Sequence, residues 1–110
     1  MNQQYDALFT PWKIGDVEIK NRIVMCPMGG TSLFGWFELG GCHFDKEAAK
    51  LFLERANNNV GLIIPGIAPL RDTFWGKWLW QNPKMFEELK EFMDEIHKTG
   101  AKLFVQLTAG

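Results

Sequence analysis

The chain has 110 residues, of which 46% are hydrophobic and 23% are charged, and its formal net charge is −1 at pH 7. This length and composition predict one small domain with a packed core and argue against intrinsic disorder. The near-neutral charge argues against binding to nucleic acid or to an anionic membrane surface, and no apolar run approaches the roughly 20 residues of a membrane span.

The N-terminal segment predicts a cytoplasmic location. Residues 1–6 contain neither the basic region nor the apolar region of a secretory signal. The cysteines, Cys26 and Cys42, are too few and too isolated to suggest a zinc site. We therefore expect both to be reduced thiols, and we expect Cys26 to be a small buried side chain within a strand.

The next residues predict a β-hairpin followed by a buried strand. Gly15-Asp16 is a two-residue turn signal between segments in which apolar and polar residues alternate. The apolar residues of this alternation are Trp12, Ile14, Val17 and Ile19. Ile23 to Cys26 is a short apolar run, the pattern of a strand that is buried on both faces. Pro27-Met28-Gly29-Gly30 then ends that strand at the position where parallel α/β folds bind their ligands.

Two later segments have the pattern of amphipathic helices. Asp45 is an N-cap residue for a helix that runs to about Asn57, and the following asparagines tolerate the left-handed conformation of a helix exit. Asn82-Pro83 opens a second helix that runs to about Thr99, with Gly100 in the position after its end. The predicted buried residues are Ala48, Leu51, Phe52 and Ala56 in the first helix and Phe86, Leu89, Phe92, Met93 and Ile96 in the second.

Two further strands and two long loops complete the pattern. The predicted strands are Val60 to Ile64, which ends at Pro65-Gly66, and Ala101 to Leu107. The predicted loops are Thr31 to His43 and Ile67 to Gln81, which have no helical period. The second loop carries an aromatic cluster that suits a substrate pocket, a lid or a subunit contact equally well. This cluster is Trp75, Trp78 and Trp80.

Three strands separated by two helices predict an α/β fold with a parallel sheet, right-handed crossovers and both helices on one side. A doubly wound sheet and a (β/α)₈ barrel both satisfy this pattern. The G-x-G-x-x-G fingerprint of a dinucleotide-binding doubly wound sheet is absent after the first strand. The long loops at the C-terminal strand ends and the hairpin suit a barrel, although a complete barrel needs about 250 residues.

Three stretches resemble the old yellow enzyme family of NADH:flavin oxidoreductases. Leu8 to Met28, L-F-T-P-W-K-I-G-D-V-E-I-K-N-R-I-V-M-C-P-M, is similar to the opening of that family. Gly61 to Pro69 resembles its second strand and following loop, and Val105 to Leu107 resembles its third strand. The branch with 2,4-dienoyl-CoA reductases and bile-acid-inducible oxidoreductases is the most similar. The resemblance implies that residues 1–110 are the N-terminal portion of an FMN-binding TIM barrel, a capping hairpin plus β-α-β-α-β, truncated after the third barrel strand.

The family implies an FMN enzyme that takes hydride from NADH or NADPH and delivers it to an activated alkene, such as an enone or an enoyl thioester. By position, Pro27, Met28 and Gly29 would line the flavin, and Gly66 would let the backbone approach its ring. Gln106 would bind the pyrimidine edge, and an amide suits that role because it offers a donor and an acceptor. No residue of this chain receives a catalytic role, because the cofactor does the hydride chemistry.

The chain also departs from the family pattern. Gly29 stands where relatives often have Thr or Cys, a side chain that tunes the flavin. The family's substrate-anchoring pair, its acid tyrosine, its phosphate-binding loops and any 4Fe-4S ligands of larger relatives lie further along the barrel. We therefore expect a fragment that is inactive alone and that self-associates, with a small-molecule substrate only in the full-length enzyme. The alternative is a non-catalytic α/β fragment or interaction module that pairs its open strand edges with a partner.

Overall fold

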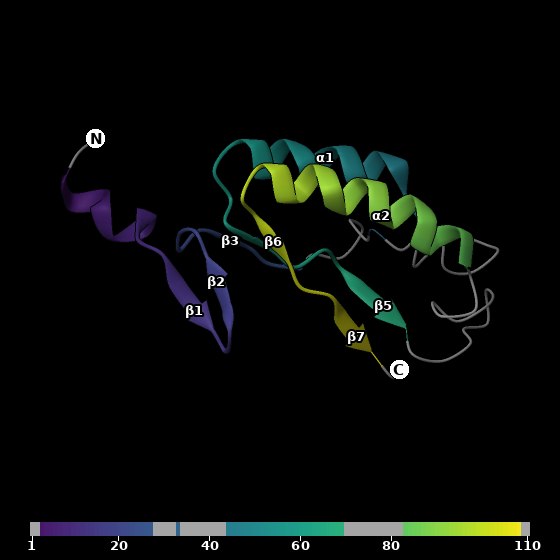
Figure 1. The fold of residues 1–110 in the computed structure, drawn as a ribbon, viewed down its shortest axis with the longest axis horizontal. Helices are drawn as coiled ribbons and strands as arrows, with labels where there is room; N and C mark the ends of the chain where they lie inside the picture. The colour runs from purple at the N-terminus through teal and green to yellow at the C-terminus, as the bar shows by residue number, and fades with distance from the viewer. Residues whose placement is uncertain (1–2, 28–32, 34–43, 70–82, 109–110) are drawn as a thin grey trace.

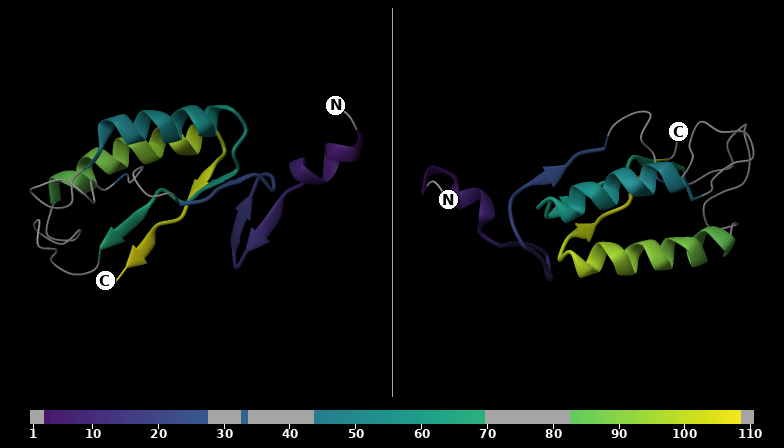
Figure 2. Two further views of the ribbon diagram at one scale, coloured as in Figure 1. Left: turned by 180° about the vertical axis from the view of Figure 1, so that it is seen from behind. Right: turned by 90° about the horizontal axis from the view of Figure 1, so that it is seen from above.

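Two helices lie side by side over one face of a parallel sheet, and a hairpin extends from one end of that sheet (Figures 1 and 2). The computed structural model describes residues 3–27, 33, 44–69 and 83–108. The molecule is elongated, with principal extents of 50 × 26 × 26 Å. This shape follows from the hairpin, which lies beyond the sheet and is not covered by either helix.

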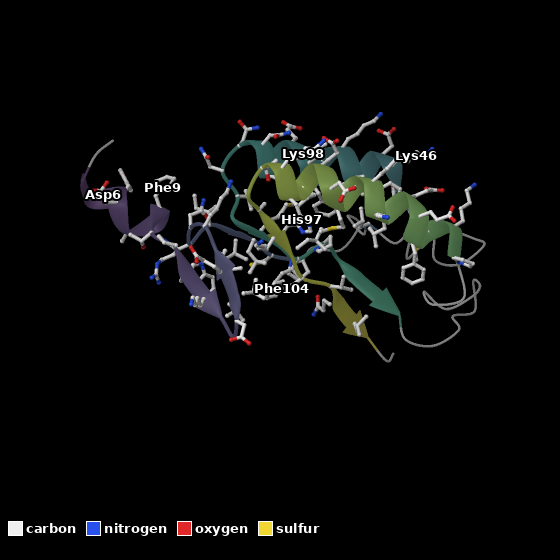
Figure 3. All side chains as sticks on the ribbon, viewed as in Figure 1. Asp6, Phe9, Lys46, His97, Lys98 and Phe104 are labelled. Atoms are coloured by element: carbon white, nitrogen blue, oxygen red, sulfur yellow. The ribbon has the colours of Figure 1, made fainter. Side chains whose placement is uncertain are left out.

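The N-terminal part consists of a 3₁₀ helix and the predicted hairpin. Helix η1 (Gln3–Phe9) carries Asp6 and Phe9 at the end of the molecule that lies farthest from the sheet (Figure 3). Strands β1 (Trp12–Ile14) and β2 (Val17–Ile19) pair antiparallel, and Gly15 in the turn has a φ of 59°. A left-handed glycine between two paired strands is the geometry that the sequence predicted, so the hairpin is confirmed.

The parallel sheet contains the three predicted strands in shorter form. Strand β4 (Leu62–Ile63) lies between β3 (Val24–Met25) and β6 (Lys102–Leu103), and both pairs are parallel. The predicted adjacency of these strands and their parallel direction are therefore confirmed. A second parallel pair, β5 (Ile67–Pro69) with β7 (Gln106–Thr108), continues beyond the first.

The prediction that the chain becomes a loop at Ile67 is wrong. Pro65-Gly66 reads as a strand end, yet β5 resumes directly after it. The third strand has a matching interruption at residues 104–105, between β6 and β7. The interruptions lie side by side in the two strands, so the strands pair again beyond them. Local sequence patterns do not reveal this renewed pairing.

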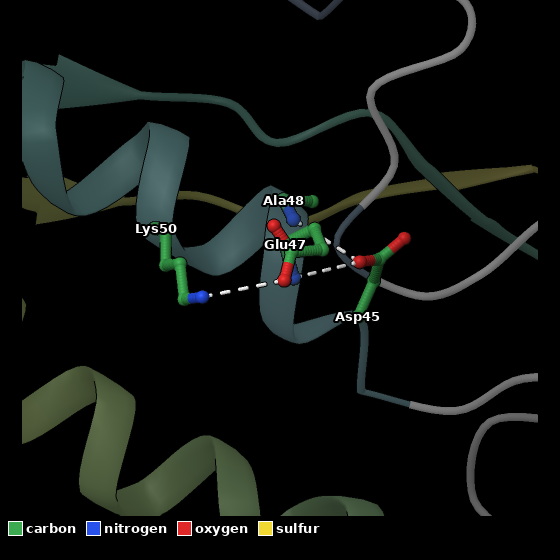
Figure 4. A network of polar contacts seen from close by, with 4 residues as sticks. All are labelled: Asp45, Glu47, Ala48 and Lys50. Carbon is green, nitrogen blue, oxygen red and sulfur yellow. Dashed lines mark hydrogen bonds and ion pairs between the residues drawn. The ribbon is translucent and has the colours of Figure 1, made fainter.

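Helix α1 (Lys46–Asn57) begins and ends where its capping residues predict. Oδ1 of Asp45 accepts hydrogen bonds from the backbone N–H groups of Glu47 at 3.0 Å and Ala48 at 3.1 Å (Figure 4). These bonds satisfy donors that have no partner within the helix. Asn59 has a φ of 74°, the left-handed conformation expected after the helix. The ion pair of Lys50 with Glu47, at 3.3 Å, is exposed and contributes little.

Helix α2 (Pro83–Lys98) likewise ends at its predicted stop signal. Gly100 has a φ of 85°, and its backbone N–H donates to the carbonyl oxygen of His97 at 3.0 Å. Asn82, the predicted N-cap residue, lies outside the described residues. His97 is exposed in the last turn, where a basic side chain interacts favourably with the helix dipole.

The core lies between the two helices and the sheet. It consists of Leu33, Ala49, Phe52, Ala56, Ile63, Met85, Phe92, Ile96 and Ala101, all of which are buried. Three details of the predicted helix faces are wrong: Ala49 rather than Ala48 is the buried alanine of the first turn of α1, Leu53 rather than Leu51 packs against the core, and Phe86 is 45% exposed. In both helices the face toward the core is set by packing against a neighbouring helix as well as the sheet. The buried stripe is therefore rotated from the one that periodicity alone favours.

The prediction that the first strand is buried on both faces is also wrong. Val24 is 36% exposed, and Cys26, which the sequence analysis placed among buried residues, is an exposed free thiol. Among the described residues β3 has a partner on one side only, which is β4. Met25, between Val24 and Cys26, packs against the core, so these two side chains belong to the opposite sheet face, which neither helix covers.

Asn21 connects the hairpin to the sheet. Its side chain is 4% exposed, its Nδ2 donates to the carbonyl oxygen of Asn59 at 2.7 Å, and its Oδ1 accepts from the backbone N–H of Ile23 at 3.0 Å. The indole N–H of Trp12 donates to the Asn21 carbonyl oxygen at 2.6 Å. A Cβ on Gly61 would approach the Asn21 Cγ to 3.0 Å and overlap its Oδ1, so glycine is required at that position.

Candidate cofactor site

The predicted site residues that the structure describes lie beyond the C-terminal ends of β3, β4 and β6, where the second parallel pair begins. Pro27 follows β3, Gly66 lies between β4 and β5, and Gln106 begins β7. Gly66 is next to Ile67, which is directly opposite Gln106 in the parallel pair. The backbones of adjacent strands lie about 4.8 Å apart, so Gly66 and Gln106 are close neighbours. Figure 1 shows β5 and β7 side by side at this end of the sheet.

A β-bulge lies within this group of residues. Strands β4 and β6 pair as far as Ile63 and Leu103, and pairing resumes at Ile67 and Gln106, so three residues of one strand lie against two of the other. Gly66, the last of the three, is buried and has a φ of 47°. Glycine adopts this left-handed conformation without the steric cost that a Cβ brings. Bulges of this kind are frequent next to binding sites because they redirect the strand.

Gln106 is accessible at the start of β7. Leu103 packs against the core beneath α1 and α2, whereas Gln106, which lies beyond the interruption at residues 104–105, is exposed. Figure 3 shows Phe104, in this interruption, away from the two helices. The Gln106 residue is thus accessible to a ligand.

These features fit the edge of a flat polar ring. An exposed primary amide offers one acceptor and two donor hydrogens, which match alternating carbonyl and N–H groups. The missing Cβ of Gly66 lets a planar group approach the backbone of the bulge. Pro27 is half-buried and offers an apolar surface. The three residues supply positioning and hydrogen bonds but no nucleophile, acid or base.

Several predicted residues lie outside the described part of the chain: Met28, Gly29, Cys42 and the Trp75/Trp78/Trp80 cluster. Within residues 3–27, 33, 44–69 and 83–108, no group of three His, Cys, Asp or Glu side chains is arranged to hold a metal ion. In the same part of the chain, no helix combines the length and apolar character needed to cross a membrane.

A surface depression among the described residues lies elsewhere, between α1 and α2. Its floor contains Ala49, Leu53 and Phe92, and its rim is formed by lysines of α1 and carboxylates of α2. Phe44 and Phe92 both line this depression, and their rings are in tilted contact with 5.6 Å between the centroids. It reflects the packing of two neighbouring helices and contains none of the residues at the strand ends.

The bulge and the β5–β7 pair are the site features that the sequence analysis missed. Ile67 to Pro69 is apolar and directly follows Gly66, and this composition is the sole local sign that a strand resumes. The register shift has no local sign, because it depends on residues that are far apart in the sequence.

The comparisons with known proteins agree with this architecture. A model of the NADH:flavin oxidoreductase / NADH oxidase family matches residues 7–110. The chain is 36% identical over 117 aligned positions to a cinnamate reductase of Clostridium sporogenes, an alignment that covers 100% of this chain and 17% of the relative. It is 35% identical over 106 positions to an NADPH dehydrogenase of Bacillus velezensis, covering 91% of this chain and 29% of that relative.

Solved structures lead to the same fold. Old Yellow Enzyme from Pichia sp. AKU4542 superimposes with a TM-score of 0.69 at 25% identity, covering 94% of this chain and 26% of the enzyme. The old yellow enzyme from Trypanosoma cruzi superimposes with a TM-score of 0.67 at 23% identity, covering 96% and 28%. The fold is thus the N-terminal portion of a TIM barrel, spanning less than a third of these relatives. Since the family model matches nearly all its residues, the chain belongs to the NADH:flavin oxidoreductase / NADH oxidase family.

Proposed function

We propose that this chain forms the first part of an FMN-dependent oxidoreductase that moves hydride from NADH or NADPH to an activated C=C bond of a small molecule, such as an enone or an enoyl thioester. The observation that carries the proposal is the grouping of Gly66 and Gln106 at a bulged pair of parallel strand ends. The names of two relatives, a cinnamate reductase and an NADPH dehydrogenase, support a reductive reaction with a nicotinamide donor.

In this proposal the chain's own residues bind and orient the cofactor. Gln106 hydrogen-bonds the pyrimidine edge of the flavin, while Gly66 lets the ring lie against the backbone of the bulge. Pro27, Met28 and Gly29 line the same ring from the end of the first strand. The flavin, when bound, supplies the hydride transfer chemistry. Holding one face of the ring against the protein also limits the access of water to it.

The remaining functions belong to parts of the barrel outside residues 1–110. We propose that these residues form a partial FMN-binding domain that ends after the third barrel strand, with the hairpin as a cap on one end of the barrel. The groups that hold the phosphate, anchor the substrate and donate a proton would come from later β/α units. The chain alone would then be inactive, and its uncovered apolar edges would favour self-association.

A hybrid protein tests the flavin proposal. This chain would replace the matching segment of the Bacillus velezensis NADPH dehydrogenase, and bound flavin would be measured by its visible absorbance. We expect a yellow hybrid that reduces an enone with NADPH. Gln106→Ala should weaken FMN binding by about 1–3 kcal/mol, which is roughly 5- to 150-fold, through loss of its hydrogen bonds.

Lys50→Ala, on the exposed surface of α1, is the matched control and should leave FMN affinity unchanged. Circular dichroism would establish that both variants fold. A folded hybrid that binds FMN equally well with and without the Gln106 amide would show that this side chain does not contact the flavin. A folded but colourless hybrid would refute the cofactor proposal itself.

A further inference from the structure

The depression between α1 and α2, the α1–α2 groove, has an apolar floor that is partly accessible. Phe44 and Leu53 are half-buried, whereas Ala49 and Phe92 are each 7% exposed. None of its described lining residues belongs to a strand, so the groove opens away from the sheet. The helices of a TIM barrel form its outer ring. This face therefore stays on the outside however the barrel is completed, and a cover for it must come from another molecule.

The two walls of the α1–α2 groove carry opposite charge. The α1 wall presents Lys46 and Lys50. The α2 wall presents four carboxylates and one lysine, which are Glu88, Glu91, Asp94, Glu95 and Lys98. Among the described residues no ion pair joins the two walls, and the pairs of Lys50, Glu88 and Lys98 lie within their own helices. The opposite charges of the walls are therefore available to another molecule.

These charges lie at matching levels along the groove. Helices α1 and α2 run in the same direction and lead into β4 and β6, which begin at paired residues (Figures 1 and 2). Lys50 and Glu91 each lie about two turns before the end of their helix. Lys46 and Glu88 each lie about three turns before it. Each of the two lysines thus has a carboxylate at its own level on the other wall.

This arrangement is complementary to itself. A twofold axis that runs parallel to the helices, above the groove, places α1 of one copy over α2 of the other and keeps the helix direction. Lys46 and Lys50 of each copy then come opposite Glu88 and Glu91 of the other copy. The same contact covers the apolar floor of both grooves. A partner with charge of one sign would instead be repelled by one of the walls.

From this self-complementarity we infer that the α1–α2 groove is an interface between two copies of this protein, which pack face to face through their helices. Helices of 12 and 16 residues are about 18 and 24 Å long, and two adjacent helices are about 20 Å wide. The face of about 400 Å² is smaller than the roughly 800 Å² per partner of a standard interface. We therefore expect a weak, salt-dependent dimer. The inference does not depend on the flavin proposal, because no flavin-site residue lines the groove.

Two charge-reversed variants of the chain test this interface. Lys46→Glu/Lys50→Glu gives an acidic variant, in which both walls are negative, and Glu88→Lys/Glu91→Lys gives a basic variant. One variant, labelled with a fluorophore at its N-terminus, would be titrated with unlabelled protein and followed by sedimentation velocity. At low salt the acidic variant should bind the basic variant about tenfold or more tightly than it binds itself, and about 1 M NaCl should remove this preference. Association through the sheet edges is common to all mixtures and does not create the preference.

Matched controls reverse exposed charges outside the groove. Lys90→Glu and Glu54→Lys should associate like the unaltered chain, because neither residue lines the groove. Circular dichroism would establish that each variant folds, and the single reversals Lys50→Glu and Glu91→Lys provide the same comparison if a double variant does not.

The preference between variants decides the inference. Tighter binding of the acidic to the basic variant, with unchanged controls, supports a dimer through the groove. Equal affinity of the acidic variant for itself and for the basic variant would overturn it. An effect of the control reversals as large as that of the groove reversals would overturn it too, because the charges would then act without regard to position.

Discussion

Asn21 holds three separate segments of the chain together through a small number of hydrogen bonds. Its side chain links the start of β3 to the turn that follows α1, and its carbonyl oxygen accepts from the indole N–H of Trp12 in the hairpin. Both side-chain polar atoms are paired in a buried position. Neither Asp nor Ala can replace it, since Asp lacks the donor and Ala lacks both groups.

Asn21→Ala should therefore destabilise the fold strongly. We expect a loss of about 2–4 kcal/mol in the free energy of unfolding, because the Ile23 N–H and the Asn59 carbonyl oxygen lose their partners. Urea denaturation followed by circular dichroism measures this change. Asn57→Ala, an exposed position of α1, is the matched control and should alter stability by less than about 0.5 kcal/mol. Equal effects of the two substitutions would contradict the proposed role of Asn21.

Gly66 offers a second residue-scale test, which separates backbone strain from cofactor binding. Gly66 and Gly15 both have left-handed φ values, 47° and 59°. Alanine at either position should cost about 1–2 kcal/mol of stability through backbone strain. In the hybrid enzyme, only Gly66→Ala should also weaken FMN binding, because only Gly66 lies at the strand ends. If Gly15→Ala weakened FMN binding as much as Gly66→Ala, the weaker binding would result from lower stability and not from the position of Gly66.

At the scale of elements, capping residues determine where the helices begin and end, while packing determines which face they bury. Asp45 begins α1 with two hydrogen bonds to backbone N–H groups, and Gly100 ends α2 in the left-handed conformation. These interactions span at most a few residues, so they are visible in the sequence. The burial of Ala49 and the exposure of Phe86 depend on contacts between α1, α2 and the sheet, which local patterns do not specify.

Removal of the Asp45 cap should destabilise α1. Asp45→Ala deletes the acceptor for two N–H groups, and we expect a loss of about 0.5–2 kcal/mol in the free energy of unfolding. Asp94→Ala, at an exposed position within α2, is the control for removing a carboxylate and should have little effect. Asp45→Asn should retain most of the stability, because an amide oxygen also caps a helix. A thermal or urea melt of the four proteins checks this order.

At the scale of the whole molecule, the chain is an open part of a closed architecture. Among the described residues, three strands form a sheet whose outer two strands each pair on one side, and helices cover one of its faces. In a complete barrel each edge strand has a neighbour and the second face of the sheet lines the interior. Here, among the described residues, that second face and the hairpin beside it keep several apolar side chains accessible.

The chain alone should therefore bind FMN weakly and show no ene-reductase activity. The contacts it offers are one amide and a few backbone groups, each contributing about 0.5–1.5 kcal/mol before the entropic cost of immobilising the ligand. Titration of FMN into the purified chain, followed by flavin fluorescence, should show no saturation in the micromolar range. Light scattering at increasing protein concentration should show self-association. Stoichiometric micromolar binding, or NADH-dependent enone reduction above the free-flavin background, would contradict this prediction.

Features that depend on neighbouring residues could be predicted from the sequence. The Gly15-Asp16 hairpin, the Asp45 cap and the Gly100 stop each rest on backbone conformations or hydrogen bonds within a few residues. The motif from Leu8 to Met28 also indicated the family, which the family model confirms. Amphipathic periodicity located both helices, although it placed their buried stripes imprecisely.

The pairing of the strands, in contrast, depends on contacts between residues that are distant in the sequence. The β5–β7 pair and the bulge at Gly66 depend on which backbones lie side by side. The exposure of Val24 and Cys26 depends on which face of the sheet the helices cover. Pairing of this kind joins residues that are distant in the sequence, and a shift of one position leaves every local propensity unchanged. For this reason the sequence could assign Gly66 and Gln106 to one end of the sheet, whereas the register decided that Gln106 lies opposite Ile67, the neighbour of Gly66.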